Sequence, residues 1–423
     1  MTNTILSQTM SSSAKELERK LLLKQLQIES LLEITTAINN NFPAEVLFRI
    51  YEFILRAQMR VSKLIVLHKN DTWNYVCYYG VNNKTISQID IEKQLLIYDK
   101  TTYLKDLDDK FLSSFELLIP VYHKEEPLAF ILIGDIEYQP HLSKEEKEAA
   151  LGEKRKFIQT ISNIIIVAIE NKRLFKRQIE QEGFKKELEV ASKVQNMLIP
   201  SVLPNNEQIE MHAFYMPHHS IGGDYYDYIP INKNEFVICM ADVSGKGIAA
   251  ALLMANVQAV LRTLSRQTSN LKELVLELNQ RVMEITNGDK FITLFLAKYH
   301  LKTRNLTYIN AGHNPPIMFA NDKIQLLESG TTILGAIEKL PFVNEGSVIL
   351  PKNTVMMTYT DGLTDLESEK GEYFEMERLQ DFVTKYAHLN MTDFNEELLQ
   401  SIKSFKGEQA YTDDVSVLSC RIF

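Results

Sequence analysis

The stretch ADVSGKGIAAALLMA, residues 241–255, organises the second half of this 423-residue chain. An apolar run from Phe236 to Met240 leads into it and predicts a strand that ends near Asp242. Glycines then allow a tight turn, and the Ala/Leu/Met-rich residues that follow predict a buried helix to about Arg266. A carboxylate at a strand end, on a turn that exposes backbone carbonyls, is a suitable ligand for a hard cation.

Three other stretches place aspartates at the edge of a predicted strand. They are IGGDYYDYI (221–229) with Asp224 after a Gly-Gly turn, VMMTYTDGLTD (355–365) with Asp361, and AYTDDVSVLSCRIF (410–423) with Asp413 and Asp414. A single aspartate in such a position more often caps a turn. Four separate stretches of this kind predict a carboxylate cluster that the fold assembles.

Six motifs resemble the metal-dependent Ser/Thr phosphatases, in particular their bacterial SpoIIE/RsbU-like branch, and occur in that family's order. They are GGDYYD, ADVSGKGIAAALLMA, FITLF (291–295), NAGHNPP (310–316), TYTDGLTD and TDDVSVL. The resemblance covers about residues 190–423. It implies an α-β-β-α sandwich with metals at one edge of its sheets, and hydrolysis of a phosphomonoester without a covalent enzyme intermediate.

The resemblance also implies a role for each aspartate. Asp242 would bridge two cations, the carbonyl of Val243 would bind one of them, and Asp361 and Asp413 would bind the other. The remaining two are Asp224, a direct or water-mediated ligand, and Asp414, which would hold a further cation or orient Asp413. Carboxylate and carbonyl oxygens suit Mn²⁺ or Mg²⁺, whereas zinc prefers His and Cys. We therefore expect two or more Mn²⁺ or Mg²⁺ ions.

Two further residues near these motifs have alternative interpretations. His313 in AGHNPP would be an acid for leaving-group protonation, but a role in pinning a tight turn beside two prolines is favoured. Lys246 in SGKG would contact substrate phosphate. The turn lacks the GxxxxGK[ST] pattern, so a nucleotide-binding loop is not supported.

The first half of the chain is predicted to form a separate domain over residues 40–170, which makes the protein α+β with two domains. A helix, two strands, a hairpin containing IPVYHKEEPLAFILIGD (119–135) and a closing helix resemble a GAF sensor domain. Trp73, Tyr75, Tyr78 and Tyr79 would line a small-ligand pocket there. Core packing is the more ordinary role of aromatic strand residues.

Two predicted helical segments flank this domain. Residues 1–39 comprise a disordered start to residue 14 and a helix whose leucines fit either a coiled coil or an amphipathic helix. Residues 171–204 form a helical linker that Pro200 and Pro204 end, and residues 205–423 form the phosphatase domain. One helical stripe runs along the linker: Phe184, Leu188, Ala191, Val194 and Leu198. We expect a homodimer through the N-terminal and linker helices.

Composition narrows the class of protein. The net charge of −9 disfavours broad binding to nucleic acid or anionic lipid. The N-terminus lacks the apolar core of a signal peptide, and three scattered cysteines are typical of a reducing compartment, so we expect a cytoplasmic protein without membrane insertion.

We therefore expect a phosphoserine/phosphothreonine protein phosphatase that its sensor domain regulates. By resemblance, its substrate would be a small phosphorylated regulator, such as an anti-sigma-factor antagonist of the STAS type. An activator or small ligand, both unknown, would act at the GAF-like domain. The alternative is a catalytically weak signalling scaffold that only binds phosphoprotein, which the complete set of aspartates disfavours.

Overall fold

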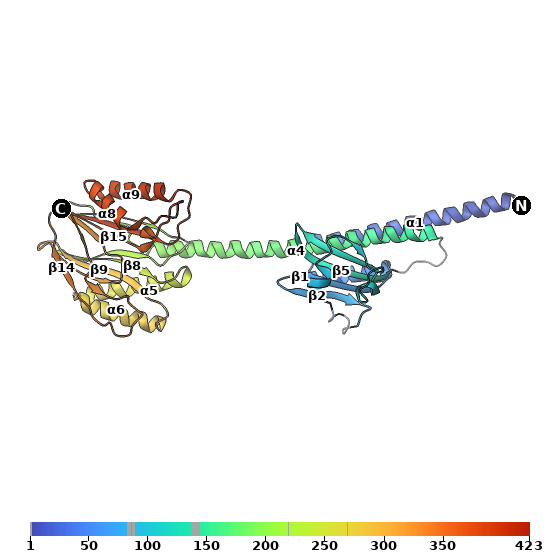
Figure 1. Ribbon diagram of the computed structural model, residues 1–423, viewed down its shortest axis with the longest axis horizontal. Helices are drawn as coiled ribbons and strands as arrows, with labels where there is room; N and C mark the ends of the chain where they lie inside the picture. The colour runs from blue at the N-terminus through green and yellow to red at the C-terminus, as the bar shows by residue number, and fades with distance from the viewer. Residues whose placement is uncertain (1, 83–85, 87–88, 137–143, 219, 269) are drawn as a thin grey trace. The chain divides into compact units, whose positions relative to one another are not determined.

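The computed structural model describes the chain except for residues 1, 83–85, 87–88, 137–143, 219 and 269. It divides into two compact units, residues 1–181 and 182–423 (Figure 1). Each unit has its own apolar core, in agreement with the prediction of two domains.

The first unit is built on an antiparallel sheet with strand order β2-β1-β5-β4-β3. The strands are β1 (Val61–Lys69), β2 (Trp73–Tyr79), β3 (Thr102–Tyr103), β4 (Leu117–His123) and β5 (Glu126–Ile136). The helices are α1 (Thr2–Asn39), α2 (Ala44–Phe53) and α4 (Lys144–Asn196), with short π-helical turns at Ile54–Gln58 and Ile91–Leu95 and a 3₁₀ turn at Leu112–Ser114. The prediction of a disordered start was wrong for residues 2–13, because α1 begins at Thr2. No Gly or Pro interrupts that segment.

The two faces of this sheet bury different side chains. One face packs Leu64, Val66 and Ile131 against residues of α1, α2 and α4. The other buries Ile65, Leu67 and their neighbours beneath the segment that joins β2 to β4.

A register shift between Val66 and Leu67 divides the aromatic residues of β2 between these faces. Cys77 and Tyr79 pack on the helical side, while Trp73 stacks on Phe130 on the other, with ring centroids 5.2 Å apart. The four aromatics proposed as one ligand lining therefore do not share a face.

Helix α4 is continuous from Lys144 to Asn196 and crosses the boundary between the units at residue 181. Its sequence contains no proline, and Pro200 follows shortly after its end. The predicted domain boundary at residue 170 thus falls within a helix. The boundary does not coincide with a break in secondary structure, and it stays a prediction.

The second unit contains two antiparallel-rich sheets packed face to face. The first has the order β13-β10-β9-β8-β7, with β14 also paired to β10. Its strands are β7 (Tyr225–Asn232), β8 (Glu235–Val243), β9 (Ile292–His300), β10 (Asn305–Ala311), β13 (Gly330–Thr331) and β14 (Gly346–Ile349). The second has the order β12-β11-β15-β16-β6. Its strands are β6 (Ile209–Met216), β11 (Ile317–Ala320), β12 (Lys323–Leu326), β15 (Thr354–Tyr359) and β16 (Val415–Ile422).

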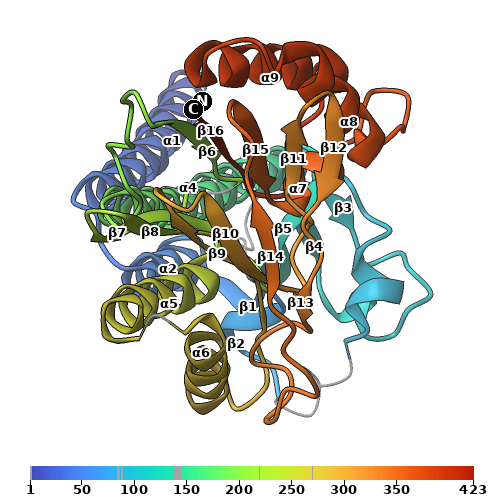
Figure 2. The ribbon, with the colours of Figure 1, turned by 90° about the vertical axis from the view of Figure 1, so that its left-hand side faces the viewer.

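Helices cover the outer face of each sheet (Figures 1 and 2). α5 (Ile248–Gln267) and α6 (Leu271–Thr286) pack on the first sheet. α8 (Glu375–Tyr386) and α9 (Met391–Lys406) pack on the second, and the short α7 (Asp361–Thr364) follows β15. Phe236, Met240 and Phe295 meet Met356 and Leu418 in the core between the sheets. The predicted α-β-β-α sandwich is confirmed.

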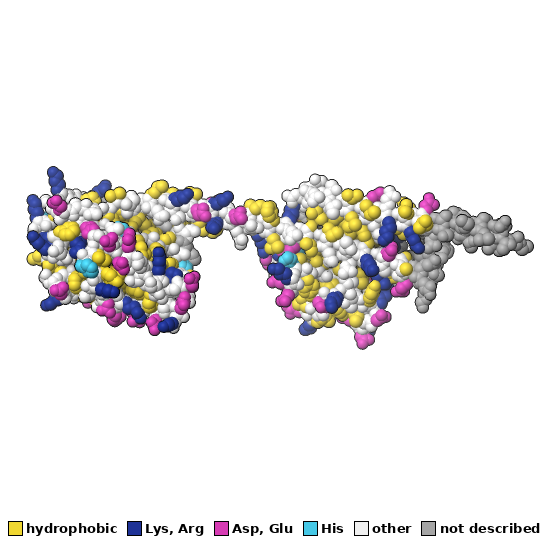
Figure 3. Space-filling view, turned by 90° about the horizontal axis from the view of Figure 1, so that it is seen from above, with side chains coloured by type: hydrophobic (Ala, Val, Ile, Leu, Met, Phe, Trp, Pro, Cys, Tyr) yellow, Lys and Arg dark blue, Asp and Glu magenta, His cyan; other side chains and the backbone are white. Residues whose placement is uncertain are grey.

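One helix in the described part of the chain, α5, is long and apolar enough by composition to cross a membrane. Its Leu253, Met254 and Val257 are buried in the core beneath the first sheet. Acidic and basic side chains are interspersed over the visible surface of the second unit (Figure 3).

Candidate functional site

The predicted carboxylates come from neighbouring strand ends of both sheets. Asp224 directly precedes β7 and Asp242 is the penultimate residue of β8, its neighbour in the first sheet. Asp361 lies two residues after the end of β15. Asp413 and Asp414 directly precede β16, the neighbour of β15 in the second sheet. The two sheets thus bring four distant stretches of sequence together.

Asp242 lies in the field of the other acidic residues. Burial and the charges of Asp361, Asp413 and Asp414 raise its pKa to about 7, and the charge of Lys246 opposes that shift. Desolvation, together with Asp365 and Asp413, also raises the pKa of Asp361. A cluster of mutually repelling carboxylates is stabilised by a cation, so its electrostatics favour binding of a positive ion.

Asp224 is the most deeply buried member of the cluster. Its Oδ2 accepts a hydrogen bond of 2.7 Å from the hydroxyl of Thr360, which in turn accepts one of 2.9 Å from the Ser416 amide. Burial, followed by the charge of Asp242, raises the pKa of Asp224 well above its ordinary value. Thr360 was not identified from the sequence, although it directly precedes Asp361 in the motif TYTDG.

Asp414 holds the Gly-Gly turn that precedes Asp224. Its carboxylate accepts hydrogen bonds from the amides of His218, at 2.7 Å, and Gly223, at 2.8 Å. A side chain at Gly222 would overlap this carboxylate, and a Cβ at Gly223 would lie 2.8 Å from the carbonyl oxygen of Val243. Glycine at both positions therefore lets the turn approach the end of β8.

Asp413 is directed differently from its neighbour. Its Oδ1 accepts the Asp414 amide at 2.9 Å, and its Oδ2 lies 2.8 Å from Nζ of Lys246, which also donates to the carbonyl of Thr412. Within the described ranges, no group of three or more His, Cys, Asp or Glu side chains is drawn close enough together to hold a metal ion. The carboxylates thus form an open set, of which Asp413 is paired with Lys246.

The donor chemistry of this set fits a hard divalent cation. Every candidate ligand is a carboxylate or backbone carbonyl oxygen, as Mg²⁺ and Mn²⁺ prefer. The buried hydroxyl of Tyr215 faces the same turn and has no hydrogen-bond partner among the described residues. Buried polar atoms of this kind are commonest where a ligand or ordered water completes a site.

The last turn of α4 contacts this site through Gln195. Its side-chain amide donates to the carbonyl of Gly222 at 2.6 Å, and its Oε1 accepts from the Gly222 amide at 3.3 Å. Gln258 of α5 donates to the carbonyl of Leu198 just beyond α4. A polar residue beside the apolar stripe is the sequence signal for Gln195, and the stripe's periodicity alone does not single it out.

His313 has the surroundings of a structural residue. It is buried, its ring Nδ1 hydrogen-bonds Thr293 at 2.7 Å, and its amide donates to Asn310 at 2.7 Å. Burial lowers its pKa to about 4, so the ring is neutral at pH 7. These contacts support the interpretation that His313 pins the turn after β10.

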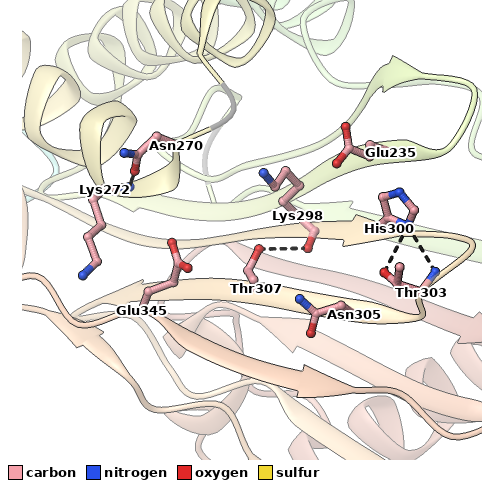
Figure 4. A pocket seen from close by; sticks show the side chains of 9 residues that line it. All are labelled: Glu235, Asn270, Lys272, Lys298, His300, Thr303, Asn305, Thr307 and Glu345. Carbon is pink, nitrogen blue, oxygen red and sulfur yellow. Dashed lines mark hydrogen bonds between the residues drawn. The ribbon is translucent and has the colours of Figure 1, made fainter.

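A polar cavity of about 530 Å³ lies elsewhere in the second unit (Figure 4). Its lining includes Glu235 at the start of β8, whereas Asp242 is near the other end. Asp242 lies seven residue steps along the strand from Glu235, or about 23 Å. The lining carries both signs of charge, with Lys272 and Lys298 beside Glu235 and Glu345. The cavity is thus separate from the carboxylate cluster.

Comparison with known families and proteins agrees with the geometry. Residues 232–423 match the family described as Stage II sporulation protein E (SpoIIE). Phosphoserine phosphatase RsbU of Bacillus subtilis is 27% identical over 239 residues, 56% of this chain and 70% of RsbU. Phosphoserine phosphatase RsbP of the same organism is 25% identical over 237 residues, 54% of this chain and 56% of RsbP.

Two further matches extend this similarity. Protein IcfG of Synechocystis sp. is 25% identical over 333 residues, 70% of this chain and 51% of IcfG. The chain therefore spans about half the length of IcfG and RsbP. The solved SiaA-PP2C domain of Pseudomonas aeruginosa superposes with a TM-score of 0.53 at 19% identity, covering 58% of this chain and 99% of that domain. This structure shows the fold.

Proposed function

We propose that the chain is a metal-dependent phosphoserine/phosphothreonine protein phosphatase regulated by its N-terminal unit. The match of residues 232–423 to the SpoIIE family, the similarity to RsbU and the fold shared with a solved PP2C domain support this proposal. The observation that carries this proposal is the meeting of Asp224, Asp242, Asp361 and Asp413 at the strand ends of both sheets. A binding module needs no such concentration of negative charge next to an anionic phosphate group.

In this proposal the aspartates divide the work. Asp242 would be shared by two Mn²⁺ or Mg²⁺ ions, the Val243 carbonyl would contribute to one, Asp361 and Asp413 would hold the other, and Asp224 would complete the set. When bound, such ions supply an activated water and neutralise charge on the phosphoryl group. Asp414 holds the Gly-Gly turn through the His218 and Gly223 amides, so its role is to position Asp224.

The substrate proposed is a small phosphorylated protein. RsbU and RsbP are named phosphoserine phosphatases, and the resemblance to their branch favours an anti-sigma-factor antagonist of the STAS type. The protein is expected to act in the cytoplasm. An activating partner or small ligand would act at the N-terminal unit.

The first experiment measures release of phosphate from p-nitrophenyl phosphate and from a phosphoserine protein, with Mn²⁺ and then with excess EDTA. We expect hydrolysis that Mn²⁺ supports and EDTA abolishes reversibly. Binding of the phosphoprotein without any turnover at saturating Mn²⁺ would favour the alternative, a signalling scaffold.

We also propose that the chain is a homodimer through α1 and the linker part of α4. Apolar side chains on both helices remain exposed: Leu17, Leu21 and Ile28 on α1, and Phe184, Val190 and Val194 on α4. A second copy of the same helices is a partner of matching apolar character. Light scattering of the full chain and of Phe184→Glu would test this, since a monomeric mass for the unsubstituted protein contradicts the proposal.

A further inference from the structure

Lys246 stands out because it is the cation in contact with the carboxylate cluster. Its Nζ lies 2.8 Å from Oδ2 of Asp413 and also donates to the carbonyl of Thr412. It belongs to the turn between β8 and α5, three residues after Val243. The contact therefore joins the turn that follows one proposed metal ligand to the side chain of another.

The electrostatic surroundings give this contact more weight than an ordinary surface pair. The two side chains are 44% and 41% exposed, and isolated pairs with such exposure contribute little to stability. Here the lysine also opposes the negative charges that surround Asp242, and it acts on Asp361 as well. One ammonium group thus offsets the mutual repulsion of several carboxylates.

A divalent cation at Asp413 would meet the same ammonium group. Oδ2 cannot keep its full ion pair with Lys246 while it also coordinates a metal, and the two positive charges repel each other. We propose that Lys246 is an internal counter-cation, which stabilises the metal-free carboxylate cluster and competes with the divalent cation for Asp413. The inference rests on the proposed function and adds a residue that sets the metal affinity of the site.

Competition makes two linked predictions for Lys246→Met, which keeps an unbranched side chain only one atom shorter but removes its charge. Mn²⁺ should bind about tenfold more tightly, because no ammonium has to be displaced. The metal-free protein should melt several degrees lower, because the carboxylates lose their counter-charge. A residue with a merely structural role would lower the melting temperature without tightening Mn²⁺ binding.

The experiment uses the full chain, freed of metal with EDTA and then dialysed. Isothermal titration with Mn²⁺ and thermal unfolding with and without Mn²⁺ are compared for the unsubstituted protein, Lys246→Met and Lys246→Arg. Lys290→Met is the matched control, because Lys290 borders Gly245 of the same turn. We expect Lys246→Arg and Lys290→Met to resemble the unsubstituted protein in both measurements.

Unchanged or weaker Mn²⁺ binding by Lys246→Met would overturn the inference while leaving the proposed function in place. Failure of the unsubstituted chain to bind Mn²⁺ at all would overturn both. If Lys246→Met does not fold, Lys246→Gln provides the same loss of charge, and the same tightening of Mn²⁺ binding is required of it.

Discussion

Asp224 and Asp227 lie three residues apart in one motif, and the fold buries both, yet it compensates their charges in opposite ways. Asp227 accepts two hydrogen bonds from the guanidinium of Arg262, at 2.6 and 2.9 Å, and another from the hydroxyl of Tyr225. Asp224 has the hydroxyl of Thr360 and two acidic neighbours.

This contrast distinguishes an ion pair that stabilises the fold from a carboxylate cluster that can bind a cation. The Asp227–Arg262 pair ties β7 to α5, so its charges are satisfied within the protein. The cluster of Asp224 with Asp242 has no such paired guanidinium, so protonation or an added cation has to relieve the repulsion between its carboxylates. A buried aspartate therefore stabilises the fold at position 227, where it is paired, and lies among repelling charges at position 224.

The largest expected effect is on activity, at the cluster. Asp242→Asn removes the proposed bridging ligand, and we expect Mn²⁺-dependent turnover to fall at least about a hundredfold. Its metal-free stability should stay equal or rise, because one of several repelling charges is gone. Phosphate release and urea unfolding in EDTA measure the two quantities. Asp381→Asn, an exposed residue on α8, is the control. Retained turnover in folded Asp242→Asn would place the catalytic site elsewhere.

Breaking the Asp227–Arg262 pair should lower the stability of the fold, which is the reverse of the result expected for Asp242→Asn. Arg262→Ala leaves the Asp227 carboxylate buried without its partner, which we expect to cost on the order of 3 kcal/mol of unfolding free energy. Arg281→Ala is a matched control, because Arg281 on α6 pairs with Glu277 and Glu284 at the surface and should cost less than about 1 kcal/mol. Urea titrations compare the two. Equal, small losses would mean that the buried pair does not hold α5 on the sheet.

The pH dependence of stability sharpens the same contrast. In the folded, metal-free protein the pKa of Asp242 is about 7, whereas an aspartate in the unfolded chain titrates near its ordinary 3.8. Between these values the folded state binds more protons than the unfolded state, so stability falls as the pH rises from about 4 to about 7. Above that range the contribution is constant. We expect a loss of about 1–2 kcal/mol between pH 5 and pH 7 from this group.

Urea titrations in EDTA at pH 5, 6, 7 and 8 measure this loss, and Asp242→Asn isolates it from other titrating groups. The substituted protein should show a flatter profile over pH 5–7. Parallel profiles for the two proteins would show that Asp242 is not held among repelling charges.

The sequence predicted those features that repeat along the chain. Apolar runs followed by aspartates predicted the two sheets and the residues at their ends, and family motifs supplied the order. The family motif singled out Asp224, but nothing in the sequence indicated that Asp227 is paired with Arg262, 35 residues away. The sequence patterns also missed Thr360 and Gln195, whose roles depend on contacts with Asp224 and Gly222. The face change in β2 arises from a register shift that side-chain periodicity alone does not reveal.

The smallest predicted effect concerns the link between α4 and the cluster. Gln195 bonds both backbone groups of Gly222, and the next residue, Gly223, donates to Asp414. Asp224 directly follows this turn, so a displacement of α4 would reach this proposed metal ligand through Gly222 and Gly223. A partner that binds one of two positions of the turn more tightly by only a few kcal/mol is enough to shift the equilibrium between them. A regulatory partner that binds α4 would therefore be able to change the position of the turn.

Gln195→Ala removes both contacts with Gly222 but leaves every proposed ligand in place. We expect turnover to fall about three- to tenfold, with partial recovery at high Mn²⁺, because the loosened turn holds Asp224 less firmly. Lys193→Ala, an exposed neighbour on the same helix, should have no effect. Steady-state kinetics at several Mn²⁺ concentrations, well below the unfolding temperature, distinguish the two variants. Loss of positioning weakens the apparent Mn²⁺ affinity, so added Mn²⁺ restores turnover. General destabilisation gives a loss of turnover that added Mn²⁺ does not restore. Equal kinetics for Gln195→Ala and the unsubstituted protein would mean that α4 does not act on the cluster through this turn. The proposed regulation by the N-terminal unit would then have to reach the site through Gln258 and α5 instead.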